Sequence, residues 1–145
     1  MFMQGLAAGY REAGTSGVFA MPYSKSSAMT FVDYRDVAEV AAIAFADDHL
    51  VNGTFELAAG GMVTRADIAA LMSKHVGRSI VAGDVEPEVA LEGMPAGGSR
   101  DGLTAMFADY TAYGFHGGNN HVLRSILGQA PRTLDSYLGE LTRPA

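Results

Sequence analysis

Two aspartates with an arginine between them form the densest charged group in the sequence: Asp33, Arg35 and Asp36. Paired carboxylates can act as general acid and general base when their surroundings separate their pKa values. Here a β-type run over residues 30–32 leads into the group, and an amphipathic helical pattern follows it. The dipole at the start of that helix and the adjacent arginine should keep both carboxylates ionised. We therefore favour helix capping and a local ion pair over catalysis, with Asp36 acting at the helix terminus.

Four histidines are the other side chains that could transfer protons or bind a metal: His49, His75, His116 and His121. No pair has the H-x-x-x-H spacing of a helical metal site, and the chain has no cysteine. His116 alone stands in a pocket-like segment, between the aromatic Phe115 and a pair of glycines after a predicted helix. A structural role is nevertheless the favoured interpretation of each histidine. We predict no metal site and no catalytic residue.

The composition is that of a folded domain, with 48% apolar and 18% charged residues in a chain of 145. We expect residues 1–145 to form a single domain. The ten basic residues are scattered and the net charge is −6, which argues against a nucleic-acid partner. No apolar run approaches the roughly 20 residues that span a bilayer, and the first residues lack a signal-peptide pattern. With the absence of cysteine, these features predict a cytoplasmic protein without a membrane partner.

Apolar periodicity and turn residues predict helices that alternate with short strands. The predicted helices cover residues 2–13, 35–47, 65–76, 87–92, 101–115, 121–127 and 134–141. The predicted strands cover residues 18–21, 29–32, 54–58 and 79–85. Thr64 with Asp67 forms an approximate capping box, Gly77 can end the same helix, and Gly14 can end the first helix. The fold class is therefore α/β, with a small sheet and several helices.

The apolar stripes of two helices mark faces that we expect to be buried. In helix 35–47 the stripe consists of Val37, Val40, Ala41 and Ala44, widened by Ile43 and Phe45. In helix 101–115 it consists of Leu103, Met106, Phe107, Tyr110 and Phe115.

Three segments resemble, in order and spacing, the NmrA-like branch of the atypical short-chain dehydrogenases, whose members carry a nicotinamide-binding Rossmann half. These segments are Met29–Ala41, Gly53–Leu57 followed by Thr64–Ala69, and Leu127–Leu138. The resemblance covers nearly the whole chain but only the C-terminal half of a full member. It implies the C-terminal, substrate-side portion of a Rossmann-type fold.

The resemblance also implies where cofactor and substrate would lie in a complete protein. The residues it places beside the nicotinamide, at the carboxyl edge of the sheet, are Met21, Pro22 and Tyr23. Lys25 in the next turn could bind phosphate or an acidic substrate, and an exposed lysine in a serine-rich turn is an equal alternative. The region after helix 101–115, with Phe115 and His116, borders the substrate pocket in the family.

The glycine-rich turn that binds a dinucleotide is missing from this sequence. No G-x-G-x-x-G run follows a strand, and none of the six tyrosines has a lysine four residues further on. Complete relatives bind NAD or NADP, and they resemble either reductases of quinones and similar small molecules or redox-sensing regulators. We expect this chain alone to bind neither dinucleotide and to be catalytically incompetent.

Two classes of function remain open. The leading interpretation is the substrate-side portion of an NmrA-like, NAD(P)-associated reductase or redox-sensing regulator with a small apolar ligand. The alternative is a stand-alone oligomeric interaction or small-ligand-binding module without enzymatic activity. Without a neighbouring half, strand 18–21 would have an unpaired apolar edge, and helix 2–13 would expose Phe2, Leu6 and Tyr10. We therefore expect a homodimer built around these elements, or association with a Rossmann half.

Overall fold

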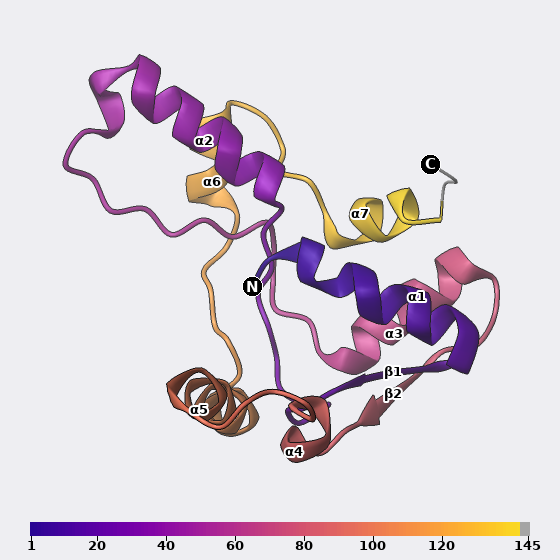
Figure 1. Ribbon diagram of the computed structural model, residues 1–145. Helices are drawn as coiled ribbons and strands as arrows, with labels where there is room; N and C mark the ends of the chain where they lie inside the picture. The colour runs from indigo at the N-terminus through magenta and orange to yellow at the C-terminus, as the bar shows by residue number, and fades with distance from the viewer. Residues whose placement is uncertain (143–145) are drawn as a thin grey trace.

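Helices alternate with two short strands in the computed structural model, which describes residues 1–142 (Figure 1). The elements are α1 (Ala7–Ser16), β1 (Val18–Met21), α2 (Tyr34–Ala46), α3 (Arg65–Val76), β2 (Val81–Asp84), α4 (Pro87–Ala90), α5 (Gly98–Tyr113), α6 (His121–Leu127) and α7 (Leu134–Glu140). Short 3-10 turns at Met3–Leu6 and Asp48–Leu50 precede α1 and follow α2. The predicted α/β class with a small sheet is confirmed. Within the described residues, no helix is long and apolar enough to cross a bilayer.

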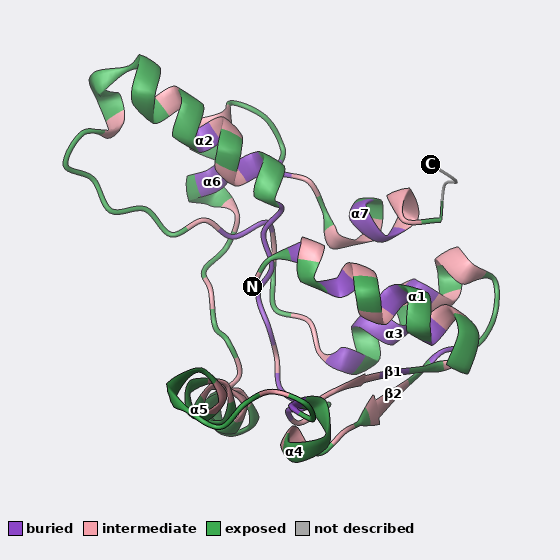
Figure 2. Cartoon of the chain, in the orientation of Figure 1, coloured by how far each residue is buried: buried purple, intermediate pink, exposed green. Residues whose placement is uncertain are grey.

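β1 and β2 pair in parallel, with Val18 opposite Val81 at the start of the register. Phe19 of β1 is buried, and Gly9 lets α1 approach its ring, because a β-carbon at Gly9 would lie 2.7 Å from it. Figure 2 shows the buried residues gathered on α1, α3 and α7, whereas α5 has none. The main core therefore lies where helices meet the strand pair, and α5 adds only the half-buried Phe107 and Tyr110 at its edge.

A buried extended segment from Met29 to Asp33 passes through the centre of the fold. Its backbone forms isolated bridges in place of the predicted strand 29–32. The Met29 N–H donates to the Val63 carbonyl, the Thr30 N–H to Phe115, and the Val32 N–H to Met1, each at 2.9 Å. Segments far apart in the sequence are thus tied to one central backbone.

The predicted strand 54–58 is wrong. Residues 54–57 are extended but lie beside no strand within residues 1–142, and the pairing begins only where the Ala59 N–H donates to the Phe31 carbonyl at 2.9 Å. The first helix continues through Gly14 to Ser16, because Gly17 with φ of +79° provides the left-handed residue that ends it.

The local capping predictions for α3 are confirmed. Thr64 and Asp67 form a reciprocal capping box, in which the Thr64 N–H donates to the Asp67 carboxylate at 2.8 Å. Gly77 adopts a φ of +75° at the other end of the helix. Thr133 caps α7 in a similar way, since its hydroxyl accepts from the Ser136 N–H at 3.1 Å. These caps depend on residues that are close in sequence, so residue type and spacing are sufficient to predict them.

Only part of the apolar stripe of α2 is buried. Val40 packs with Leu123 of α6 in a small second cluster. Ala41 and Ala44, predicted to be buried, are exposed, and Phe45 is 94% exposed. The end of α2 extends away from the rest of the chain in Figure 1, so its outer turns lack the covering element that the stripe implies.

Ion pairs hold the start of α2. Asp33 is buried and caps the helix by accepting from the Arg35 N–H at 2.8 Å and from the Arg35 guanidinium. Burial would raise the pKa of Asp33, but the hydrogen bonds from Arg35 and Gln4 outweigh it and hold that pKa below its usual range. The predicted cap and local ion pair are therefore confirmed.

Asp36 has a larger role than the helix-terminus function that we expected. Its buried carboxylate accepts from the Arg132 N–H at 2.9 Å and pairs with the Arg132 guanidinium, which also contacts Glu39 at 2.7 Å. The pair ties α2 to the segment before α7, 96 residues along the chain.

Replacing Phe31 by alanine should destabilise the fold by about 3 kcal/mol, because Phe31 is buried in the main core. Phe45→Ala is the matched control, since the Phe45 ring is exposed and its loss should cost less than about 0.5 kcal/mol. Urea unfolding followed by circular dichroism measures both. Equal losses would show that Phe45 is covered in solution.

Asp36→Asn should destabilise the fold by about 2–3 kcal/mol, because it removes the charge that Arg132 pairs with at a buried position. Glu39→Gln removes the other, exposed partner of Arg132 and should cost less than about 1 kcal/mol. Thermal unfolding distinguishes the two variants. A loss in Asp36→Asn no greater than in Glu39→Gln would mean that the buried pair contributes little.

Candidate functional site

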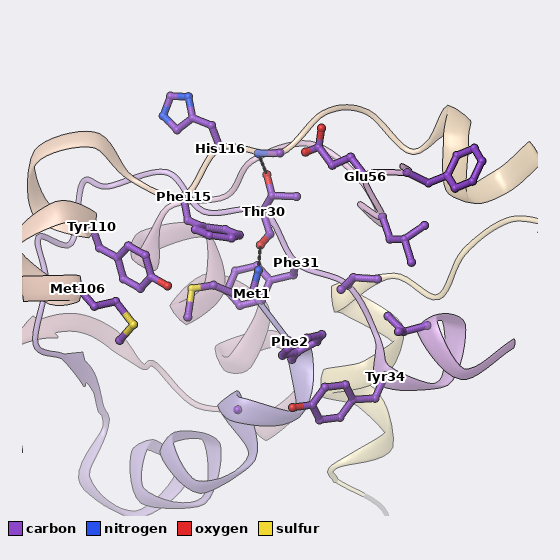
Figure 3. A pocket seen from close by; sticks show the side chains of 16 residues that line it. Met1, Phe2, Thr30, Phe31, Tyr34, Glu56, Met106, Tyr110, Phe115 and His116 are labelled. Carbon is purple, nitrogen blue, oxygen red and sulfur yellow. Dashed lines mark hydrogen bonds between the residues drawn. The ribbon is translucent and has the colours of Figure 1, made fainter. Parts of the chain in front are cut away.

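A cavity of about 680 Å³ lies between the N-terminal turn, the central segment, residues 55–57 and α5 (Figure 3). We call it the aromatic cavity, after the rings that line it: Phe2, Tyr34, Phe55, Tyr110 and Phe115. Phe2, Tyr34, Phe55 and Phe115 are between 42% and 51% exposed, although rings of this size are usually buried. The cavity is therefore an apolar surface that the described residues leave open.

Backbone pairing with the central segment positions two of these rings. Phe2 bridges to Val32 and lies 4.2 Å from the ring centroid of Tyr34. The Phe115 N–H donates to the Ala28 carbonyl at 3.0 Å, immediately after Gly114. Gly114 has a φ of +70°, and a β-carbon there would collide with the Ala28 carbonyl. Only glycine fits this turn, which carries the chain from α5 into the cavity wall.

Several hydrogen-bonded polar groups lie along one rim of the cavity. The Gly117 N–H donates to the Thr30 hydroxyl at 2.9 Å, and the Gly118 N–H donates to the Glu56 carboxylate at 2.6 Å. The Met1 ammonium donates to the Thr30 carbonyl at 2.7 Å, and burial lowers the pKa of this α-amino group. The aromatic cavity, with apolar walls and a polar rim, suits a flat apolar molecule with few hydrogen-bonding groups.

A second cavity, of about 310 Å³, lies at the carboxyl ends of β1 and β2. Beneath it the fully buried Arg65 donates to the carbonyls of Tyr23 and Gly83 and contacts the Asp84 carboxylate at 2.9 Å. Its guanidinium lies 4.7 Å from the centroid of the Tyr23 ring. Burial raises the pKa of Tyr23, against the opposing effect of Arg65. Arg65 thus fixes the loop after β1 to the end of β2.

The predicted site residues divide between the two cavities. Met21 is half-buried against the core, and Pro22 and Tyr23 are buried beside the second cavity. Lys25 is exposed there and forms an ion pair with Asp84 at 3.7 Å. Phe115 and His116 line the aromatic cavity, but the His116 ring points away from the other side chains in Figure 3. No contact in the structure tests the cofactor or substrate roles, which stay predictions.

Sequence reasoning missed most of the cavity lining. Tyr110 and Met106 were assigned to a buried helix face, but α5 has no buried residue and both side chains face the cavity. No sequence motif marks Phe2, Tyr34 or Phe55 as site residues, although all three line the cavity. The sequence does show that several large aromatic residues lie outside the predicted apolar helix faces. It does not show that these rings come together around one cavity.

The other candidates for chemistry have structural partners. His75 contacts Asp135 at 2.8 Å, linking α3 to α7, and His49 contacts Asp47. Among residues 1–142, no group of His, Cys, Asp or Glu could hold a metal ion. Asp33 and Asp36 do not line either cavity.

No curated protein sequence matches this chain. Solved structures of low sequence identity share its fold. A nucleoside-diphosphate-sugar epimerase from Staphylococcus aureus aligns with a TM-score of 0.80 and 18% identity over 96% of this chain and 49% of its own. An NADPH-dependent quinone oxidoreductase from Escherichia coli, complexed with NADPH, aligns with a TM-score of 0.80 and 22% identity over 98% and 51%. Triphenylmethane reductase from Citrobacter sp., complexed with NADP(H), aligns with a TM-score of 0.75 and 17% identity over 92% and 47%.

The chain therefore spans about half the length of the solved structures that it matches. The model of the NmrA-like family matches residues 1–138, nearly the whole sequence. This match covers all three segments on which the resemblance was based, and the chain belongs to the NmrA-like family.

Proposed function

We propose that this chain is the substrate-side portion of an NAD(P)-associated reductase or redox-sensing regulator, in which the aromatic cavity binds a flat apolar molecule. The observation that carries the proposal is the cavity itself, where rings from separate segments surround an open space with hydrogen-bonded polar groups along one rim. Quinones, the molecules named for one structural neighbour, are flat and have carbonyl oxygens as their polar groups. The absence of cysteine is in keeping with a reducing compartment such as the cytoplasm.

The dinucleotide of complete relatives does not fit the described residues alone. Its pyrophosphate needs a glycine-rich turn whose backbone N–H groups open a helix after a strand. Here β1 leads into Pro22 and Tyr23, and β2 ends at Asp84, so neither strand leads into a glycine-rich turn that opens a helix. A Rossmann half must therefore supply the pyrophosphate site. Met21, Pro22 and Tyr23 would then contribute to the nicotinamide side, and Lys25 to the binding of substrate.

A stand-alone oligomeric module is the second candidate, and one observation favours it. Val18 and Val81 face each other across the strand pair and are 40% and 56% exposed, although parallel sheets are normally covered on both faces. The dimer surface predicted from the sequence needs correction, because Leu6, Tyr10 and Phe19 are buried within the chain. The exposed valine pair is the surface that remains for a homodimer.

The isolated chain should bind 1,4-naphthoquinone with a dissociation constant on the order of tens of micromolar and should not bind NADPH. Phe55→Ala should weaken quinone binding about three- to tenfold, because Phe55 lines the cavity and loses its ring contacts. Phe45→Ala, an exposed ring outside the cavity, is the control and should bind normally. Isothermal titration calorimetry measures all three. NADPH binding of similar strength would contradict the proposal.

If the chain dimerises through the strand pair, Val81→Lys should convert it to a monomer at about tens of micromolar, because a charge on an apolar sheet face blocks association. Val51→Lys places a charge at a similarly exposed valine after α2 and should leave the dimer intact. Sedimentation velocity distinguishes these outcomes. A wild-type monomer at this concentration would refute the dimer.

A further inference from the structure

We propose that the Tyr110 hydroxyl donates a hydrogen bond to a carbonyl oxygen of the bound ligand. The aromatic cavity would thereby prefer flat carbonyl compounds such as quinones to hydrocarbons of the same shape. The inference rests on the proposed function, because it assigns one atom of the same cavity to the recognition of that ligand class.

The Tyr110 hydroxyl is available for this contact. Figure 3 shows it directed into the cavity from α5. Among residues 1–142, no hydrogen bond reaches it, whereas the Thr30 hydroxyl and the Glu56 carboxylate at the rim already accept from Gly117 and Gly118. A phenol hydroxyl on an apolar wall is a neutral donor that gains from a ligand acceptor.

The ring that carries this hydroxyl is held on two sides. Tyr110 makes an edge contact with Tyr23, with centroids 5.7 Å apart and planes at 87°. On the cavity side it makes a second edge contact with Phe115, at 5.7 Å and 74°. Such pairs contribute beyond their buried area and restrict the ring.

The anchor of this stack is Arg65. Its buried guanidinium lies under the Tyr23 ring and is fixed by the carbonyls of Tyr23 and Gly83. Tyr23, in the loop after β1, is buried and contacts Tyr110 ring edge to ring face. The donor is therefore positioned before any ligand arrives, which limits the entropy lost on binding.

A direct test compares 1,4-naphthoquinone with naphthalene, which has the same fused rings without oxygen, in NMR titrations of the whole chain. Tyr110→Phe keeps the ring and removes only the hydroxyl. It should weaken naphthoquinone binding about three- to tenfold, as loss of one neutral hydrogen bond does, and leave naphthalene binding unchanged. Tyr113→Phe, on the exposed side of the same helix, should change neither.

A vibrational spectrum of the bound ligand tests the hydrogen bond directly, because it reports on the quinone carbonyl and not on the stability of the variant. The carbonyl stretching frequency of bound naphthoquinone should lie lower in the wild type than in Tyr110→Phe. Equal effects on both ligands, or unchanged quinone binding, would overturn the inference while leaving the cavity as the ligand site. If neither compound binds the wild-type chain, the proposed function fails and the inference fails with it.

Discussion

A buried backbone must pair its N–H and C=O groups, and the central segment from Met29 to Asp33 does so with distant parts of the chain. Its N–H groups donate to Val63, Phe115 and Met1, and its Phe31 carbonyl accepts from Ala59. The same few residues bury Phe31 in the core and place Asp33 at the start of α2. These hydrogen bonds hold Met1 and Phe115, which line the aromatic cavity, against the central segment. The fold and the candidate site therefore depend on one extended segment.

The sequence predicts local structure correctly where that structure depends on interactions within a few residues. Thr64 with Asp67, and Gly77, satisfy the ends of α3 by local hydrogen bonds and a left-handed turn, so their types predicted their roles. Residues 54–58 and the outer stripe of α2 depended on what lies opposite them. Thr54 to Leu57 have the composition of a strand but pair with no strand within residues 1–142. Phe45 completes an apolar stripe but is 94% exposed. A pattern predicts which face would be buried, and it cannot supply the element that buries it.

The candidate site was predictable only in part, for a related reason. The loop from Met21 to Tyr23 was located by the rule that ligands bind at the carboxyl ends of parallel strands. That rule does not reveal that Arg65, the first residue of α3, is buried and holds the Tyr23 carbonyl. With Tyr23 held inward, Tyr110 takes the position next to the open space. One buried cation therefore links the loop at the second cavity to the wall of the aromatic cavity.

The exposed rings cannot all serve the same partner. Tyr34 shares a helix face with Ala38, Ala41 and Phe45, spaced by three or four residues, and all are exposed. This stripe continues from the cavity along α2, farther than a small molecule reaches, and a contiguous apolar strip of this kind is typical of protein contact. Tyr110 and Phe115 lie instead beside the polar rim formed with Thr30 and Glu56, where a ligand oxygen finds hydrogen-bonding groups. A protein partner that covered the α2 side would leave the Tyr110 side of the cavity to a ligand, so such a partner and the small molecule that we propose would not compete for one surface.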